Sequence, residues 1–490
     1  MLSTADRIRT GALMLALLST AGCGAGDGPT SPGDFSITVN ATNVAVAAGH
    51  TERLSVHVTR IGGFDEPVTF AATPAGQGPL ATFTANGPDA AFLDLTAPAA
   101  LEPGPYAITV TATADGVAPQ HVDIAINVLA GGPSAVAMGS VAAGDTHSCA
   151  LSGAGAAFCW GSGADGQLGI DPAIQESSAP VAVQGGQLFT SLVLPAIGGV
   201  SCGIAADGAA YCWGRATFAL FGETAAFAIH PLPTRVAPAL HFRSFAVGLD
   251  HVCGIATDGV TYCWGTNSYG ALGDGTVVSR PVPTAVAGGH VFTRITAGAW
   301  YTCGITAAGS AYCWGLGVNG TLGTGDGTVE ALIPTAVAGA PAFDSIAGSG
   351  LVACGLTHAG AAWCWGRNAY GEVGDGTTAI RSVPTLVTGG LAFANLATGF
   401  EFACGITAAG TAYCWGENHS GALGDGSVID RSHPTAVTGG LSFRTISAGT
   451  RHSCGVTTSD EVFCWGDNSG GKLGDGTTEA RLAPTAVRWP

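Results

Sequence analysis

Apolar and polar residues alternate with a period of two along much of residues 34–130, a pattern that predicts short β-strands. Residues 54–58 place an apolar side chain at every second position, and the same alternation returns at 106–110 and 122–128. Clusters of Gly and Pro separate these stretches and predict turns. About seven short strands within about 100 residues are typical of a β-sandwich, which we expect over residues 34–130.

From about residue 134 the strand pattern repeats with a period near 50 residues. The tripeptide Cys-Trp-Gly occurs seven times, and successive copies lie 53, 51, 50, 51, 50 and 50 residues apart. The copy at 443–487 contains four strand-like pieces separated by Gly-rich turns. One such unit cannot bury both faces of its sheet alone, so neighbouring units must stack. We therefore predict an all-β chain in which residues 134–490 form a seven-bladed β-propeller.

The second repeat departs from the pattern. Its approach to the first Cys reads Pro-Ala-Ile-Gly-Gly-Val at 195–200, and Leu-Phe-Gly-Glu at 220–223 replaces Leu-Gly-Asp-Gly. These differences predict altered loops in the second blade.

Fourteen of the fifteen cysteines form pairs whose members lie ten residues apart. In the fourth pair, a three-residue hairpin loop at 307–309 would place Cys303 directly opposite Cys313, within reach of a disulfide, and Tyr312 over Gly304. Zinc binding and redox catalysis are the alternatives, but both usually use cysteines spaced as Cys-x-x-Cys. We predict seven structural disulfides, Cys149–Cys159, Cys202–Cys212, Cys253–Cys263, Cys303–Cys313, Cys354–Cys364, Cys404–Cys414 and Cys454–Cys464.

The first 22 residues have the layout of a secretory signal peptide. Two arginines precede an apolar run at 12–18, which is too short to span a bilayer, and small residues follow it. Cys23, directly after Ala-Gly, resembles the lipidated Cys of the bacterial lipobox, although Thr20 stands where that motif usually has Leu. We predict lipidation of Cys23, and plain secretion is the alternative. Residues 23–33 are rich in Gly and Pro and predict a flexible tether.

Composition and charge narrow the possible functions. Charged residues make up 10% of the chain and the net charge is −17. An acidic chain is unsuited to nucleic acid, which requires Lys and Arg, but it fits a soluble surface or a basic partner. No nucleotide-binding or hydrolase motif is present in the sequence. We expect a protein that is not an enzyme and that needs no cofactor and no metal.

The repeats resemble those of the regulator of chromosome condensation family. That family has Gly-x-x-His-(Ser/Thr), matched at 144–148 and 449–453, and Trp-Gly-x-Asn-x-x-Gly-Gln-Leu-Gly, matched at 264–273 and 415–424. The resemblance covers about the last 355 residues and implies a propeller. Branches of the family exchange guanine nucleotides on a small GTPase, sense ultraviolet light or inhibit β-lactamases, so the fold transfers and the function does not. Residues 34–130 resemble the immunoglobulin-like modules of bacterial surface proteins, without the Cys and Trp of antibody domains.

Three sets of repeated residues are better explained by structure than by chemistry. The Trp of each Cys-Trp-Gly is expected to pack between blades. One Asp in each of several Gly-Asp-Gly turns is expected to cap loop amides, because single carboxylates 50 residues apart do not converge on calcium. The family's Gly-x-x-His position is expected to be structural as well. These sets include Trp314, Asp274, Asp375, Asp425, Asp475, His147, His251 and His452.

The turn before the first Cys of each repeat varies where the scaffold is constant. It carries large aromatic residues in two repeats, and aromatic side chains often anchor interfaces. We predict a partner-binding rim of Trp300, Tyr301, Phe400, Phe402, Asp250 and Arg451. Local packing of these aromatics over neighbouring blades is the alternative.

Together these features predict a monomeric, non-catalytic scaffold of the bacterial cell envelope that binds a protein or a glycan. Its membrane contact would be the lipid anchor alone, in the outer membrane of a Gram-negative cell because Gly24 rather than Asp follows Cys23. An inhibitor of a secreted enzyme is the alternative function. Guanine-nucleotide exchange is less favoured, because export separates the chain from cytosolic GTPases.

Overall fold

The computed structural model describes residues 34–39, 43–47, 51–74, 78–85, 89–98, 101, 104–129, 138–217, 220–222 and 227–489. The predicted signal peptide, Cys23 and the tether at 23–33 lie outside these residues. The described chain is almost entirely β-strand, with two short 3-10 turns, η2 (Val318–Gly320) and η3 (Ser469–Gly471). Within it, no helix has the length and apolar character needed to cross a membrane. The chain divides into two compact units near residue 128.

The first unit contains two four-stranded sheets. One sheet has the antiparallel order β1 (Asp34–Val39), β3 (Thr51–Ile61), β6 (Ala90–Thr96) and β5 (Leu80–Ala85). The other has the order β2 (Asn43–Ala47), β8 (Gln120–Leu129), β7 (Gly104–Thr113) and β4 (Thr69–Pro74). Val56, Leu93, Val110 and Ile124 are fully buried, as the period-two pattern predicts.

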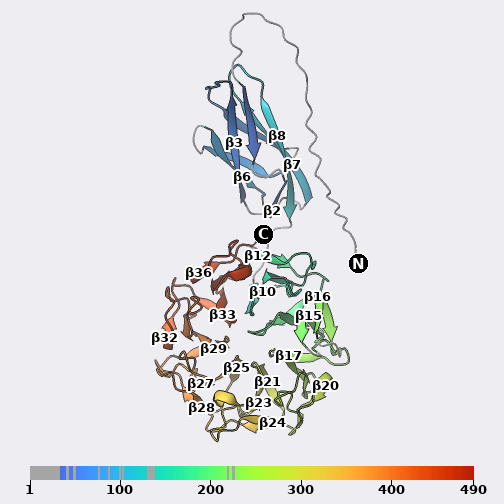
Figure 1. The fold of residues 1–490 in the computed structure, drawn as a ribbon, viewed down its shortest axis with the longest axis vertical. Helices are drawn as coiled ribbons and strands as arrows, with labels where there is room; N and C mark the ends of the chain where they lie inside the picture. Colours follow the sequence, from blue (N-terminus) through green and yellow to red (C-terminus); the bar gives the residue numbers. More distant parts are fainter. Residues whose placement is uncertain are drawn as a thin grey trace, which may run out of the picture. The chain divides into compact units, whose positions relative to one another are not determined.

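The second unit contains seven four-stranded sheets within the described part of 138–486, and each sheet follows the order of the sequence. Figure 1 shows them around a common centre, with the first strand of each sheet innermost and the fourth outermost. Sheets 1 to 3 comprise β9 (Met138–Ala143), β10 (His147–Ser152), β11 (Ala157–Ser162) and β12 (Glu176–Ala182); β13 (Phe189–Val193), β14 (Val200–Ala205), β15 (Ala210–Thr217) and β16 (Phe227–Val236); β17 (Phe242–Val247), β18 (His251–Ala256), β19 (Thr261–Gly265) and β20 (Arg280–Ala285).

Sheets 4 to 7 continue the same arrangement. They comprise β21 (Phe292–Ala297), β22 (Tyr301–Thr306), β23 (Ala311–Leu316) and β24 (Glu330–Ala336); β25 (Ser345–Ser349), β26 (Val352–Leu356), β27 (Ala362–Gly366) and β28 (Arg381–Leu386); β29 (Phe393–Thr398), β30 (Phe402–Thr407), β31 (Ala412–Gly416) and β32 (Arg431–Ala436); β33 (Phe443–Ala448), β34 (His452–Thr457), β35 (Val462–Gly466) and β36 (Arg481–Ala486).

The central hairpin of each sheet carries the cysteine pair. In sheet 4 Cys303 lies opposite Cys313 and Gly304 opposite Tyr312, which confirms the predicted register. All seven predicted pairs are joined as disulfides, with Cα–Cα distances of 4.0–4.1 Å. The ring that covers Gly304 is Phe292 from β21 rather than Tyr312, because a Cβ at Gly304 would lie 2.6 Å from the Phe292 ring.

The tryptophan of each Cys-Trp-Gly joins two consecutive sheets, as predicted. All seven indoles are buried, and each Nε1–H donates to a backbone oxygen of the preceding sheet at 2.9–3.0 Å. Trp314 of sheet 4, for example, donates to the oxygen of Ala271 in sheet 3. Trp160 of sheet 1 donates in the same way to Lys472 of sheet 7.

The first and seventh sheets therefore meet through the contacts that join consecutive sheets. Gly476 of sheet 7 donates its N–H to the Ser178 oxygen of sheet 1 at 2.9 Å, just as Gly426 of sheet 6 donates to Leu482 of sheet 7. The Ala143 N–H also donates to the Ser447 hydroxyl at 2.9 Å.

The Gly-Asp-Gly aspartates hold the loops before the fourth strands, as predicted. Asp425 accepts the N–H of Ser427 at 2.9 Å and its hydroxyl at 2.7 Å, and it pairs with the Arg431 guanidinium at 2.7 Å. Asn418 donates to the backbone oxygens of Ser427 and Ile429 across the same loop. The loop is therefore fixed from both ends.

Asp425→Asn is expected to destabilise the second unit by about 2–4 kcal/mol, because it replaces the buried carboxylate by a neutral amide and leaves Arg431 without its charged partner. Urea denaturation followed by tryptophan fluorescence measures this loss. Asp326→Asn in sheet 4 is the matched control, since Asp326 bonds only with neighbouring groups such as the Thr328 hydroxyl. Equal destabilisation by the two changes would contradict this explanation.

Candidate functional site

Each sheet of the second unit has two chemically different ends. In an antiparallel meander the first and third connections lie at one end, and the second connection and the link to the next sheet lie at the other. Hydrogen bonds tie the two connections at the first end together, as when Leu316 N–H donates to the Trp300 oxygen at 2.9 Å. We call the end with the first and third connections the variable face and the other end the repeated face.

The two faces differ in how far the repeats diverge. The repeated face carries near-identical turns such as Ala-Ala-Gly at 307–309 and 408–410 and Gly-Gly at 288–289, 389–390 and 439–440. On the variable face, the residue after each Trp-Gly differs between consecutive sheets, with six residue types in seven sheets. These residues are Ser162, Arg215, Thr266, Leu316, Arg367, Glu417 and Asp467.

Charge is also concentrated on the variable face. Among the described residues its connections contain three cationic side chains, Arg367, Arg451 and Lys472, and fifteen carboxylates. The described connections of the repeated face contain one cation, Arg488, and five carboxylates. The fifteen carboxylates are Asp145, Asp165, Asp171, Asp250, Asp274, Asp326, Glu372, Asp375, Glu401, Glu417, Asp425, Asp430, Asp467, Asp475 and Glu479.

The structure places four of the six predicted rim residues on the variable face. Trp300, Phe400 and Asp250 are half-buried there, and Arg451 is exposed. Tyr301 and Phe402 were wrongly predicted, because both are fully buried.

Tyr301 and Phe402 begin the second strands of their sheets, and a strand alternates its side chains between two sides. They stand two residues before the first Cys, the position that His147 holds in sheet 1. Because the family histidine is expected to be structural, the alignment of Tyr301 and Phe402 with it indicates from the sequence that both side chains point between sheets.

The three family histidines each bridge two consecutive sheets. His147 Nε2 lies 2.6 Å from the Ser201 hydroxyl and His251 Nε2 lies 2.9 Å from that of Thr302. The Ser201 hydroxyl donates to the Gln167 oxygen at 3.0 Å, so the histidine nitrogen is the donor to it. Burial lowers the pKa of His147 to about 3 and that of His251 to about 4, so both stay neutral near pH 7.

A serine beside a histidine is also the arrangement of a nucleophile and its base. Here both His147 and Ser201 are 0% exposed, so a substrate has no access to the pair. The described residues also contain no group of three or more His, Cys, Asp or Glu side chains that could hold a metal ion. What the structure shows of the three histidines is a buried hydrogen bond from each to a hydroxyl of a neighbouring sheet.

The variable face carries aromatic groups that the sequence reasoning missed. Tyr269 is 42% exposed and its ring packs edge-on against Trp300, with centroids 6.2 Å apart. Tyr370 lies under the Arg367 guanidinium at 5.2 Å and edge-on to His419 at 5.5 Å. Tyr269 and Tyr370 lie in the third connections, four positions after the Gly of Trp-Gly, where the copies also differ.

The second sheet departs from the others in its first connection, which confirms the expectation of altered loops. This connection spans 194–199, six residues against the two or three of the other sheets. Pro195 and Ala196 are buried, and the Ala196 oxygen accepts a hydrogen bond from the Thr450 hydroxyl of sheet 7. The segment therefore reaches across the centre of the unit.

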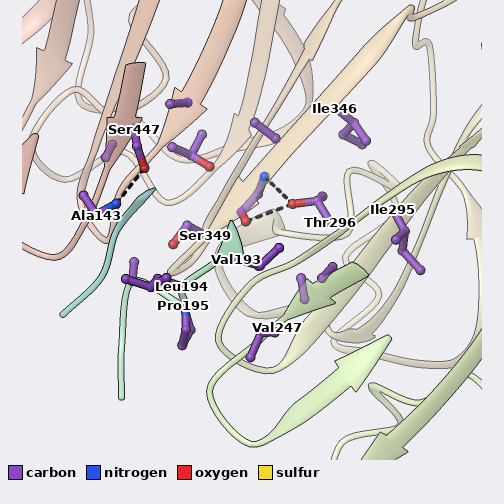
Figure 2. A pocket seen from close by; sticks show the side chains of 18 of the residues that line it. Ala143, Val193, Leu194, Pro195, Val247, Ile295, Thr296, Ile346, Ser349 and Ser447 are labelled. Atoms are coloured by element: carbon purple, nitrogen blue, oxygen red, sulfur yellow. Dashed lines mark hydrogen bonds between the residues drawn. The ribbon is translucent and has the colours of Figure 1, made fainter. Parts of the chain in front are cut away.

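A central cavity of about 260 Å³ lies beside this segment (Figure 2). Residues from the innermost strands of all seven sheets line it, and none of the lining side chains is ionisable. Thr296, Ser349, Thr398 and Ser447 supply its hydroxyl groups. Such a lining can hold water or a small neutral molecule, but it supplies no general acid or base.

Comparison with protein families agrees with this architecture. Residues 118–443, about two thirds of the chain, match the RCC1-like domain, and 443–472 and 459–490 each match a regulator of chromosome condensation (RCC1) repeat. The probable E3 ubiquitin-protein ligase HERC4 of Rattus norvegicus is 31% identical over 140 residues, 27% of this chain and 13% of that protein. The ultraviolet-B receptor UVR8 of Arabidopsis thaliana is 29% identical over 146 residues, 28% of this chain and 31% of that protein.

The chain thus spans less than a third of the length of these curated relatives. Among solved structures, Prp20p from Saccharomyces cerevisiae superposes with a TM-score of 0.58 at 21% identity, over 66% of this chain and 84% of that chain. Human WBSCR16 superposes with a TM-score of 0.60 at 20% identity, over 68% and 95% of the two chains. These identities establish the fold alone. With the Cys-Trp-Gly repeats and the linked four-stranded sheets, they show that this chain belongs to the RCC1-like domain family and forms a β-propeller of RCC1-type repeats.

Proposed function

We propose that the second unit is a closed seven-bladed propeller and that the first unit is an immunoglobulin-like sandwich. The bond from Trp160 to Lys472 supports closure, since it repeats between the first and last sheets the bond found between consecutive sheets. Two four-stranded sheets with a shared apolar interior support the sandwich.

The function that the geometry supports best is a non-catalytic binding platform of the cell envelope. The observation that carries this proposal is the contrast between the two faces. The exposed Tyr269, the half-buried Trp300, Tyr370 and Phe400 and many charged side chains lie on the variable face, whereas the repeated face carries the same small-residue turns in most sheets. A surface that differs from blade to blade on a constant scaffold is suited to recognising one partner, a protein or a glycan.

The predicted signal peptide and the lipidation of Cys23 supply the proposed location. Fourteen buried, disulfide-bonded cysteines suit an oxidising compartment outside the cytosol. In this proposal the chain is monomeric, the first unit is a stalk and the propeller presents its variable face. Inhibition of a secreted enzyme is the second candidate, because such an inhibitor also needs a rigid exported surface with aromatic anchors.

The double variant Tyr269→Ala/Trp300→Ala is expected to weaken partner binding at least about tenfold, because aromatic anchors carry much of an interface's binding energy. Biolayer interferometry with a partner captured from envelope extract measures the change. Val260→Ala/Val291→Ala, two exposed residues of the repeated face, is the matched control. Unchanged binding by the aromatic variant, or equal loss in the control, would reject the variable face as the binding surface.

A further inference from the structure

The longer first connection of sheet 2 also borders a second cavity, which we call the sheet-2 pocket. It has a volume of about 300 Å³ and opens between the first connections of sheets 1, 2 and 3 on the variable face. This volume is at the lower end of the range of small-ligand sites, about 300–1,000 Å³. The side chains that matter here are Asp145, Asp165, Arg215, Ile197, Leu220 and Leu249.

Acidic groups outnumber basic groups around the pocket. Two carboxylates, Asp145 and Asp165, and one guanidinium, Arg215, line the pocket, and Arg215 lies 3.3 Å from Asp165. Asp145 accepts the N–H of Gly198 at 3.3 Å. Lys472 donates to the backbone oxygen of Asp145 at 3.2 Å, but its charge is matched by Asp467 at 2.6 Å. The pocket therefore keeps a net negative charge.

The carboxylates are held in place by their surroundings. The N–H of Asp165 donates to Gln167 Oε1 at 2.8 Å, and Gln167 is buried. The carboxylate of Asp165 lies against Gly199, where a Cβ would come within 2.8 Å of Oδ2. Glycine at 199 thus allows Asp165 to lie over the backbone of sheet 2. A positioned acceptor of this kind is what a charged donor recognises best.

The rest of the pocket wall is aliphatic. Ile197 and Leu220 come from two connections of sheet 2 and Leu249 comes from sheet 3, and Ile197 and Leu249 are only half-buried. Lys and Arg side chains combine an apolar stem with a charged head, so they match a wall of this composition. Four of the fifteen carboxylates of the surrounding variable face pair with the arginine that begins the following strand, and the remaining carboxylates still outnumber the cationic side chains. An acidic surface of this kind attracts cationic partners and repels anionic ones.

We propose that the sheet-2 pocket receives the side chain of an arginine or lysine presented by a polypeptide bound on the variable face. The charged head lies between Asp145 and Asp165, and the aliphatic stem lies along Ile197, Leu220 and Leu249. This inference rests on the proposed binding function and adds the chemistry of the partner: a protein with an exposed basic residue rather than a neutral glycan.

The test uses N-acetyl-arginine methylamide as the probe and the citrulline analogue as its neutral counterpart of the same shape. Each is titrated into the full chain while the Ile and Leu methyl signals are followed by NMR. The arginine probe is expected to shift the Ile197 methyl signal in a saturable manner, and the citrulline probe is expected to leave it unchanged. Equal shifts with both probes, or none with arginine, would overturn the proposal.

The variant Asp145→Asn/Asp165→Asn is expected to weaken both the arginine probe and the captured partner at least about tenfold, since it removes the two acceptors. Asp258→Asn/Asp460→Asn makes the same change of net charge on the repeated face and is expected to leave both affinities unchanged. The pocket variant could bind the partner with wild-type affinity while Tyr269→Ala/Trp300→Ala still binds it weakly. That result would overturn this inference but would leave the proposed binding function intact. If neither pair of changes affects the partner, both fail.

Discussion

The propeller is expected to lose at most roughly 7 kcal/mol of stability when the pH falls from 6.5 to 4.5, because three buried histidines must stay neutral in the folded state. Burial lowers the pKa of His147 to about 3 and of His251 to about 4, and it lowers that of His452 well below 6.5. In the unfolded chain all three take up protons near pH 6.5. Below this pH the unfolded state therefore binds more protons, and stability falls as the pH falls.

The local geometry explains why these histidines resist protonation. The Nε2 atoms of His147 and His452 face the hydroxyls of Ser201 and Ser148, while their Nδ1 atoms are buried without a hydrogen-bond partner. A second proton would place a charged donor in a site with no acceptor. Burial raises the pKa of the Glu372 carboxyl, so protonation of this group stabilises the folded state as the pH falls and offsets part of the loss caused by the histidines.

Urea denaturation at several pH values between 7.5 and 4.5 measures this dependence. Tryptophan fluorescence reports the propeller alone, since all ten Trp residues lie between 160 and 489. Replacing His147, His251 and His452 by Gln is expected to flatten the profile above pH 5, whereas His241→Gln on the repeated face should not. A wild-type stability that stays constant from pH 7 to 5 would show that the histidines do not control it.

Reduction of the seven disulfides is expected to prevent the propeller from folding. Each bond closes a loop between residues ten apart, worth at most about 3 kcal/mol of chain entropy. Seven such bonds give roughly 20 kcal/mol as an upper value, which exceeds the net stability of about 5–15 kcal/mol that is usual for folded proteins. Losing even half of this sum would remove the folded state.

The same bonds are expected to resist reductant while the propeller is folded, because all fourteen cysteines are 0–1% exposed and thiols cannot reach them. Intact mass in native buffer with dithiothreitol should stay constant, whereas concentrated urea with dithiothreitol should add about 14 Da for seven reduced bonds. Removing urea while keeping the reductant should not restore native fluorescence, but removal after reoxidation should. Reduction in native buffer without loss of structure would contradict this account.

Local rules were enough to predict the hairpins. The ten-residue spacing of Cys303 and Cys313 with a Gly-containing loop leaves one short-loop register, and the structure has that register. The covering ring at Gly304 was assigned to the wrong residue, because Phe292 comes from a different strand, and a hairpin rule contains no information about it.

The binding surface was predicted less well than the scaffold. Trp300 and Tyr301 are neighbours in the sequence, yet one lies on the variable face and the other is fully buried, because a strand begins between them. Tyr269 and Tyr370 were missed because each acts through a partner from another sheet or connection. The sheet-2 pocket joins residues from three sheets, a juxtaposition that spacing along the chain does not encode.

The sequence by itself determined the repeat, the cysteine pairing and the role of the Cys-Trp-Gly tryptophans. These depend on contacts within one hairpin or on a pattern that recurs seven times, and both are visible in spacing. Only the tertiary structure decided which face is variable, which aromatic residues are buried, and that the departure in sheet 2 crosses the centre and borders an acidic pocket. Those features depend on how separate sheets are juxtaposed, and a contact between distant segments leaves no periodic trace in a single sequence.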